Sequence, residues 1–138
     1  MRRIGTFAVL LVLAMTLARA DNDEAIAIAK EATLSWLSLT DLGNYEESWV
    51  RAASNFRAAV SRADWVRSMT AVRAPLGQLN SREIASSSFA LTLPGAPDGE
   101  YVVLQFNTSF GNKGSAVETV TAMKDDDDTW RVAGYYIK

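Results

Sequence analysis

The chemistry open to this chain is narrow, because its sequence contains no histidine and no cysteine. Neither a Ser-His-Asp nor a Cys-His arrangement can form, and zinc sites with His and Cys ligands are excluded. A carboxylate base, a Tyr acid, a Ser-Lys pair or an oxygen-ligated metal would remain. The sequence also lacks a Ser-x-x-Lys motif and a Gly-rich phosphate loop. We therefore assign no catalytic residue, no metal site and no cofactor.

Glu118 is the carboxylate with the strongest claim to chemistry. We expect it in the middle of a strand, on an otherwise apolar face, where the loss of hydration would raise the pKa of its carboxyl group. Pairing with Arg73, Arg82 or Arg131 would oppose that rise. A general base could arise in this way without histidine. A structural ion pair, or a strand charge that faces water, is the simpler interpretation.

Aromatic side chains could line a ligand pocket, because binding sites are largely apolar with a few placed polar groups. Most aromatic residues of so small a domain must also belong to its core, where burying each one contributes about 1.5–3 kcal/mol. Our candidate pocket combines three aromatic with three polar side chains. Its members are Trp36, Tyr45, Trp49, Arg73, Gln105 and Glu118.

The acidic run Asp125–Asp128 invites interpretation as a calcium site. An EF-hand loop that began there would need glycine at its sixth position and glutamate at its twelfth, but Trp130 and Tyr136 stand at those places. We predict a solvated hairpin turn instead, because aspartate favours turns.

The first twenty residues have the pattern of an export signal. Two arginines precede an apolar stretch at 4–17, and residues 18–20 (Ala-Arg-Ala) give a small-x-small cleavage site. The apolar stretch falls short of the roughly 20 residues that span a bilayer. We predict a signal peptide over 1–20, cleavage after Ala20, a periplasmic or secreted location and no stable membrane anchor after cleavage.

Residues 21–138 are expected to form one acidic domain. Loss of the three arginines of segment 1–20 reduces the 14 basic side chains to 11, against 16 acidic ones, so the net charge becomes −5. Nucleic-acid binding depends largely on Lys and Arg that neutralise phosphates, so we exclude that partner. The length is typical of a single domain with its own core.

The hydrophobic period changes from helical to strand-like along this domain. Cap patterns, Gly43 and the pair Pro75 and Gly77 predict helices that end before a second half of alternating residues. In that half Val102, Leu104, Phe106 and Phe110 are expected on one face. The predicted helices are 22–42, 45–53, 55–60 and 62–73, and the predicted strands are 82–93, 100–110, 115–124 and 129–137.

Short connections between those strands predict antiparallel neighbours. The fold class is therefore α+β, with N-terminal helices packed on a curved four-stranded antiparallel sheet. We expect no internal repeat and no linker.

Four sequence blocks, in order, resemble an uncharacterised group of secreted bacterial proteins, domain-of-unknown-function family 4019. The resemblance covers nearly all of the chain after residue 20 and implies no established activity. The blocks are Trp36–Trp49, Arg73–Gly77, Gly99–Phe106 and Trp130–Lys138.

The segment Trp36–Trp49 is also similar to the NTF2-like, or cystatin-like, superfamily. This resemblance implies a cone of helices and bent sheet with a pocket. Such folds host isomerases, cyclases and dehydratases as well as non-catalytic binding or dimerising modules, so the fold does not choose a function. Members that use a His-Asp pair have no counterpart here, because the chain has no histidine.

Three hypotheses about function follow. The favoured one is a non-catalytic periplasmic or secreted module that binds a small apolar ligand or a protein partner. The second is a lyase-like or isomerase-like enzyme that uses Glu118 or Asp41 with a Tyr acid. The third is a self-associating domain, a homodimer whose interface is the sheet face with Tyr101, Val103 and Gln105.

Overall fold

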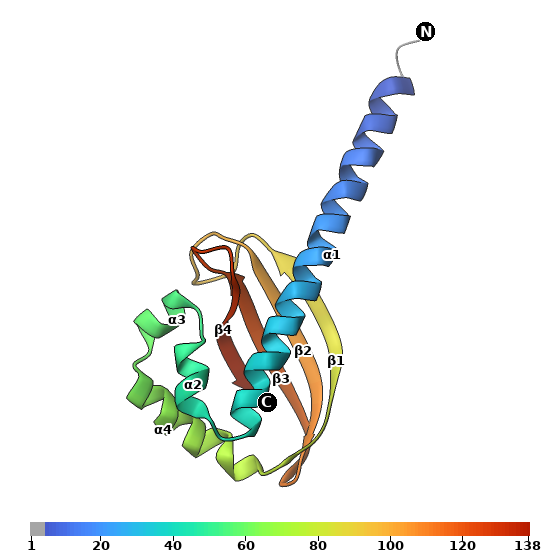
Figure 1. The fold of residues 1–138 in the computed structure, drawn as a ribbon. Coiled ribbons are helices and arrows are strands. Elements are labelled where there is room, and N and C mark those ends of the chain that lie inside the picture. The colour runs from blue at the N-terminus through green and yellow to red at the C-terminus, as the bar shows by residue number, and fades with distance from the viewer. Residues whose placement is uncertain (1–4) are drawn as a thin grey trace.

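The computed structural model describes residues 5–138, and the two arginines that open the predicted export signal lie outside this range. Helices come first and strands second, as the sequence predicts, so the fold class is α+β (Figure 1). In chain order the elements are α1 (Gly5–Asp41), α2 (Tyr45–Val50), α3 (Ser54–Ala59), α4 (Arg62–Val72), a 3-10 turn (Ala74–Leu76), β1 (Leu79–Ala90), β2 (Tyr101–Phe110), β3 (Lys113–Lys124) and β4 (Trp130–Ile137).

The four strands form one antiparallel sheet in the order β1-β2-β3-β4. Each strand pairs with the next one in the chain, which confirms the prediction of short connections between antiparallel neighbours. The predicted alternation is also confirmed, since Val102, Leu104, Phe106 and Phe110 are all buried on the face that meets the helices. Register shifts interrupt the ladders within β1 and between β3 and β4.

Helix α1 is longer than the pattern of apolar residues predicts. We expected it to start near residue 22, where Asp21 and Glu24 have the spacing of a capping box, but it begins at Gly5 and passes through that pair. Its end agrees with the prediction, because Gly43 has φ +75° and takes the left-handed conformation that terminates helices. None of the helices within 5–138 has both the length and the apolar character needed to cross a membrane.

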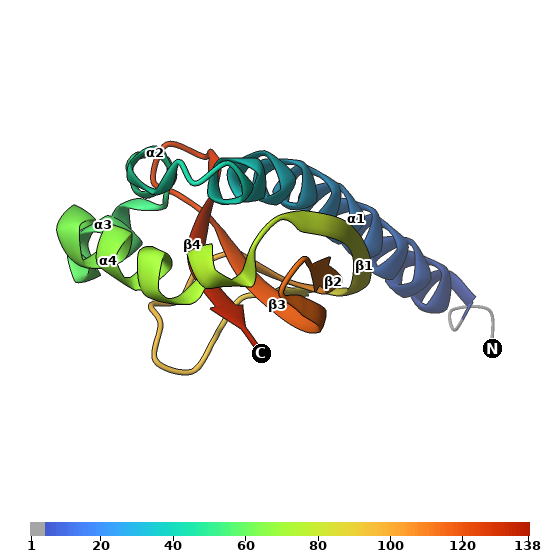
Figure 2. The same cartoon turned by 90° about the horizontal axis from the view of Figure 1, so that it is seen from below.

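The core lies between the helices and one face of the sheet (Figure 2). Trp36 of α1 packs against Trp65 of α4, with ring centroids 6.1 Å apart, and edge-on against Tyr135 of β4 at 5.4 Å. Ser61 caps α4 by accepting a hydrogen bond from the Asp64 amide at 3.2 Å, as its position predicts.

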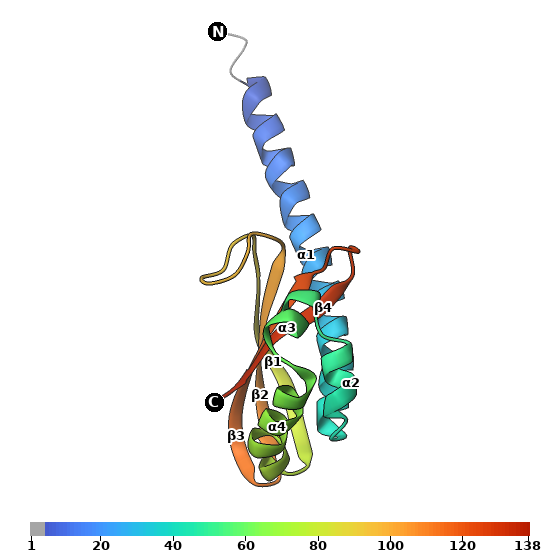
Figure 3. The ribbon, with the colours of Figure 1, turned by 90° about the vertical axis from the view of Figure 1, so that its left-hand side faces the viewer.

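The other face of the sheet carries no helix within residues 5–138, and only the β1–β2 connection folds over it (Figure 3). That loop buries Tyr101, whose hydroxyl donates to the Pro97 carbonyl. Elsewhere this face mixes polar residues with Val103, Val117 and Tyr136. Gln105 is exposed and its amide links Ser86 of β1 to Thr119 of β3, with contacts of 3.3 Å on each side.

Candidate functional site

Glu118, in the middle of β3, is fully buried. Its carboxylate accepts hydrogen bonds from three side chains on three other strands. Arg82 donates to it from Nε at 2.7 Å and from Nη2 at 3.2 Å, and Thr108 donates from Oγ1 at 2.6 Å. The Tyr135 hydroxyl is the third donor. Both oxygens of the carboxylate are therefore engaged by protein groups.

Arg82 links Glu118 to the end of α1. Its guanidinium also donates to both oxygens of Asp41, at 2.8 and 2.9 Å, and Arg73 approaches the same carboxylate at 3.3 Å. Two arginines thus meet two carboxylates, so the formal charges cancel, which is the condition under which the interior tolerates ions. We call this group the Glu118 cluster: Asp41, Arg73, Arg82, Thr108, Glu118 and Tyr135.

Protonation within the Glu118 cluster follows from burial and pairing. Burial alone would lower the pKa of Arg82, but its hydrogen bonds to Asp41 and Glu118 outweigh that effect, and the pKa ends above its ordinary value. Burial raises the pKa of Tyr135, and the neighbouring charge of Glu118 raises it further. Tyr135 therefore stays neutral and keeps its proton as a donor to Glu118.

Arg73 has two contacts that the other members lack. Its guanidinium carbon lies 4.4 Å from the centre of the Phe110 ring, and it donates to the Gly77 carbonyl at 2.7 Å. Its Nε is buried without a hydrogen-bond partner among residues 5–138. The side chain thus joins the end of α4 to β2 and to the turn before β1.

The buried carboxylate of Glu118 does not line the hollows described on residues 5–138. Five hollows on these residues have none of Asp41, Arg82 and Glu118 in their lining, and Thr108 is the cluster member that lines one of them. A general base must come within about 2.6–3.2 Å of the proton that it removes. The Glu118 cluster fastens α1 to the sheet, and it holds Glu118 at 0% side-chain exposure while Asp41 at its rim is 16% exposed.

The acidic hairpin between β3 and β4 holds a second group of charges. Asp125 is buried, and it accepts from the Ser54 amide at 2.9 Å and from the Ser54 hydroxyl at 2.6 Å. Arg131 approaches Asp125 at 3.3 Å and binds both oxygens of Asp127 at 2.6 and 2.7 Å. We call Ser54, Asp125, Asp127 and Arg131 the Asp125 cluster.

The predicted solvated turn is correct for Asp126, Asp127 and Asp128, which are exposed, but wrong for Asp125. Asp125 binds the first residue of α3 and so caps a six-residue helix that has no buried side chain of its own. The hydrogen bond from the Ser54 hydroxyl contributes most to a pKa of Asp125 below its usual value.

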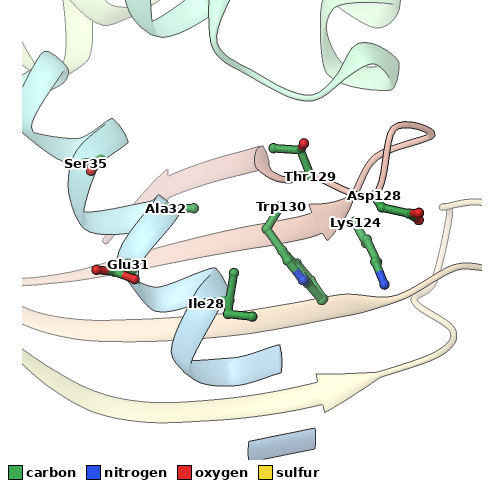
Figure 4. A pocket seen from close by; sticks show the side chains of 8 residues that line it. All are labelled: Ile28, Glu31, Ala32, Ser35, Lys124, Asp128, Thr129 and Trp130. Atoms are coloured by element: carbon green, nitrogen blue, oxygen red, sulfur yellow. The ribbon is translucent and has the colours of Figure 1, made fainter. Parts of the chain in front are cut away.

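An open groove runs between α1 and the β3–β4 hairpin (Figure 4). One hollow of about 560 Å³ is continuous with a second of about 360 Å³, because both are lined by Ala32, Ser35, Thr129 and Trp130. These volumes fall in the range of small-ligand sites, roughly 300–1,000 Å³. We call it the α1–hairpin groove, and its other lining residues are Ile28, Glu31, Trp36, Val50, Arg51, Lys124, Asp128, Arg131 and Val132.

The six residues of the candidate pocket do not share one hollow among those found. Arg73 and Glu118 meet in the Glu118 cluster, whereas Gln105 lies on the opposite face of the sheet. The indole of Trp36 donates to the Ser48 carbonyl at 2.7 Å, and that of Trp49 to the Val60 carbonyl at 2.7 Å. Of the six, Trp36 alone lines the groove, while Tyr45 and Trp49 pack against the core.

Sequence reasoning named three arginines as partners for Glu118 and did not single out Thr108. Thr108 follows Phe106 by two residues, so strand alternation already placed it on the inner face. Arg82 joins the cluster because the register of β1 and β2 places it opposite Thr108. The groove had no signal in the sequence, because it depends on how far α1 stands from the hairpin.

Comparison with known proteins identifies a family. The family model described as "Protein of unknown function (DUF4019)" matches residues 32–135, from the second half of α1 to Tyr135 within β4. No curated protein matches the sequence. Because the matched segment includes both charged clusters and more than half of the chain, this protein belongs to the DUF4019 family.

Proposed function

We propose that the chain is an exported, non-catalytic binding module whose binding surface is the α1–hairpin groove. One observation carries this proposal: the best-placed carboxylate, Glu118, is saturated and lies outside the five hollows, whereas the groove is open and partly apolar. The functional surface is therefore separate from the buried charges.

The structure fits only part of what the enzyme hypothesis requires, which is a carboxylate near Tyr or Arg that a substrate can also reach. Glu118 lies within hydrogen-bond range of Tyr135 and Arg82, as a carboxylate base with a Tyr acid would need. The same hydrogen bonds occupy the carboxylate, and Glu118 lines none of the five hollows described on residues 5–138. Catalysis there would require the Arg82 pair to open, which leaves buried charges unpaired.

The groove has the composition of a binding site. Ile28 is 46% exposed and lies beside the indole of Trp130, so an apolar group placed there loses contact with water on two sides (Figure 4). Lys124, Glu31 and Asp128 supply charge at the rim. A few polar groups around an apolar floor are typical of sites that orient a ligand.

Export belongs to the same proposal. Residues 18–20, at the predicted cleavage site, are exposed, and the first buried side chain of α1 in the described residues is Ala29. A cut after Ala20 would leave the buried stripe of α1 intact. The helix-and-sheet arrangement is compatible with the NTF2-like cone suggested by Trp36–Trp49, and that likeness remains part of the proposal.

The test is to express the full chain in a Gram-negative bacterium and to weigh the periplasmic protein by native mass spectrometry. We expect a mass that begins at Asp21, together with a retained apolar ligand or a captured partner. An Ala20→Arg variant should stay uncut, because the cleavage pattern needs a small residue there. An unprocessed wild-type chain in the cytoplasm would contradict export.

Binding is tested on the same preparation with the apolar dye ANS. We expect fluorescence enhancement in the wild type and its loss in Ala32→Arg, which fills the middle of the groove. Ala63→Arg, in the separate hollow beside α4, is the matched control and should bind dye like the wild type. Equal dye binding by all three proteins would contradict the assignment of the groove.

A further inference from the structure

The groove lies along an edge of the sheet. β4 is the last strand in the order β1-β2-β3-β4, so its far side has no neighbouring strand among residues 5–138. The segment between α2 and α3 covers part of that side, where the Ala53 amide donates to the Val132 carbonyl at 2.8 Å. Thr129 and Trp130 precede the covered point and line the groove.

The backbone N–H and C=O of Trp130 point away from β3, toward this open edge of the sheet. In an antiparallel pair, the N–H and C=O of one residue point the same way, and successive residues alternate. Lys124, opposite Trp130, donates its N–H to Glu100 on the β2 side, and Thr129 accepts from Asp125 on the β3 side. The N–H and C=O of Trp130 therefore face away from β3, in the same direction as the occupied carbonyl of Val132.

These two backbone groups of Trp130 have no hydrogen-bond partner on α1, α2 or α3 among the described residues. A small apolar molecule would cover them without pairing them, and burying an unsatisfied backbone group is unfavourable. An extended peptide pairs them and also places alternate side chains into the groove. The edge therefore favours a peptide strand over a small apolar ligand.

The free charges at the rim define the side chains of that peptide. Glu31 and Asp128 are exposed and form no ion pair among residues 5–138, whereas Lys124 lies 3.6 Å from Glu100. At the far end, the arginines at positions 51 and 131 are paired with acidic residues. The unpaired charge is thus negative, and it complements lysine or arginine beside an apolar residue.

We propose that the α1–hairpin groove binds an extended peptide that adds as a strand to the Trp130 edge of β4. The peptide alternates basic residues, which meet Glu31 and Asp128, with apolar residues, which enter between Ile28 and Trp130. This inference rests on the proposed function and specifies its partner as a basic, apolar segment of another protein.

The experiment titrates the processed protein with a capped peptide of alternating Lys and Val residues and follows backbone amides by NMR. Two further peptides carry N-methyl groups, one on all Val amides and the other on all Lys amides. Because alternate amides of a strand point to opposite edges, one methylated peptide is blocked from β4 and the other is not. We expect one of them to bind at least about tenfold more weakly than the parent, and the other to match it.

Side-chain specificity is tested with a Glu-Val peptide and with charge variants. The Glu-Val peptide should not bind. Glu31→Gln and Asp128→Asn should each weaken the Lys-Val peptide severalfold at low salt and less at high salt. Asparagine tolerates the positive φ of Asp128, +63°, so that variant keeps the turn. Glu46→Gln on α2, outside the groove, is the matched control.

Slower hydrogen exchange at the Trp130 amide on peptide binding would support strand addition. Equal weakening by both sets of N-methyl groups, or equal binding of the Glu-Val peptide, would overturn it. If the peptides fail while ANS still distinguishes Ala32→Arg from wild type, the peptide inference falls and the binding module stands. If neither peptide nor dye binds, both proposals fall.

Discussion

The Glu118 cluster and the Asp125 cluster use the same chemistry at different depths. Each joins a buried carboxylate to an arginine and a hydroxyl donor, and each ties a helix to the sheet. In the first the arginine side chain is 8% exposed, and in the second it is 28% exposed. The two clusters therefore differ in how well water can solvate the charge that remains when its partner is removed.

Depth decides what each cluster contributes. Water can solvate Arg131 and Asp127 if their pair is broken, so the pair itself is worth little. Water has little access to Arg82, whose side chain is 8% exposed, so loss of Glu118 leaves a guanidinium partly unpaired in the interior. The Glu118 cluster is thus costly to break, whereas the Asp125 cluster acts mainly through the backbone that it caps.

Glu118→Ala should have the largest effect, because it leaves Arg82, Thr108 and Tyr135 without their acceptor. We expect a loss of about 3–5 kcal/mol in the free energy of unfolding, measured by urea denaturation at neutral pH. Glu83→Ala, an exposed glutamate on β1, is the control and should change stability little. A loss below about 1 kcal/mol for Glu118→Ala would mean that the cluster is not a structural tie.

Tyr135→Phe should have the next largest effect, about 1–3 kcal/mol, because it removes one donor and leaves the Glu118 acceptor underpaired. Since burial raises the pKa of Tyr135, wild-type stability should also fall as pH rises above the ordinary tyrosine value of about 10. The phenylalanine variant should lack that component. Tyr136→Phe, at the exposed neighbouring position, should behave like wild type.

Asp125→Asn should cost about 1–2 kcal/mol, because it weakens the cap on α3. The pKa of Asp125 is lowered in the folded state, so its contribution is present above the ordinary aspartate value of about 3.9 and is lost as pH falls below it. Urea midpoints at descending pH should therefore converge for the wild type and the variant. A constant gap down to low pH would contradict the role of the charge.

Asp127→Asn should have the smallest effect. The bidentate pair with Arg131 lowers the pKa of Asp127, yet this carboxylate is 56% exposed and its pair is open to salt. We expect thermal unfolding at neutral pH and moderate salt to be unchanged within error. A clear destabilisation would show that the hairpin depends on the pair of Asp127 and Arg131. The two clusters would then both be stabilised by their ion pairs.

Much of the fold was predictable, because alternation and turn residues are local signals. All four strands were placed within three residues of their observed ends, and the inner face of β2 was named correctly. The start of α1 was not predictable from its capping pattern, because a cap ends a helix only where the chain also turns away. Nothing between Gly5 and Asp41 interrupts α1.

The site was predicted less well, because it depends on register. Strand alternation placed Glu118 inside, but the choice among three arginines was decided by the alignment of Arg82 with Thr108. A register shift between β3 and β4 places Tyr135 opposite Val120, so its hydroxyl reaches the same carboxylate. Such offsets of one residue leave no trace in composition or periodicity.

The contact between Trp36 and Tyr135 has a consequence for the order of folding. α1 leaves the ribosome first, but its indole packs edge-on against a ring of the last strand, and its final residue Asp41 is held by an arginine of β1. These partners are far apart in sequence, so the native core closes only after β4 is available. The chain therefore stays short of its native core while it is being made, because α1 cannot complete that core alone.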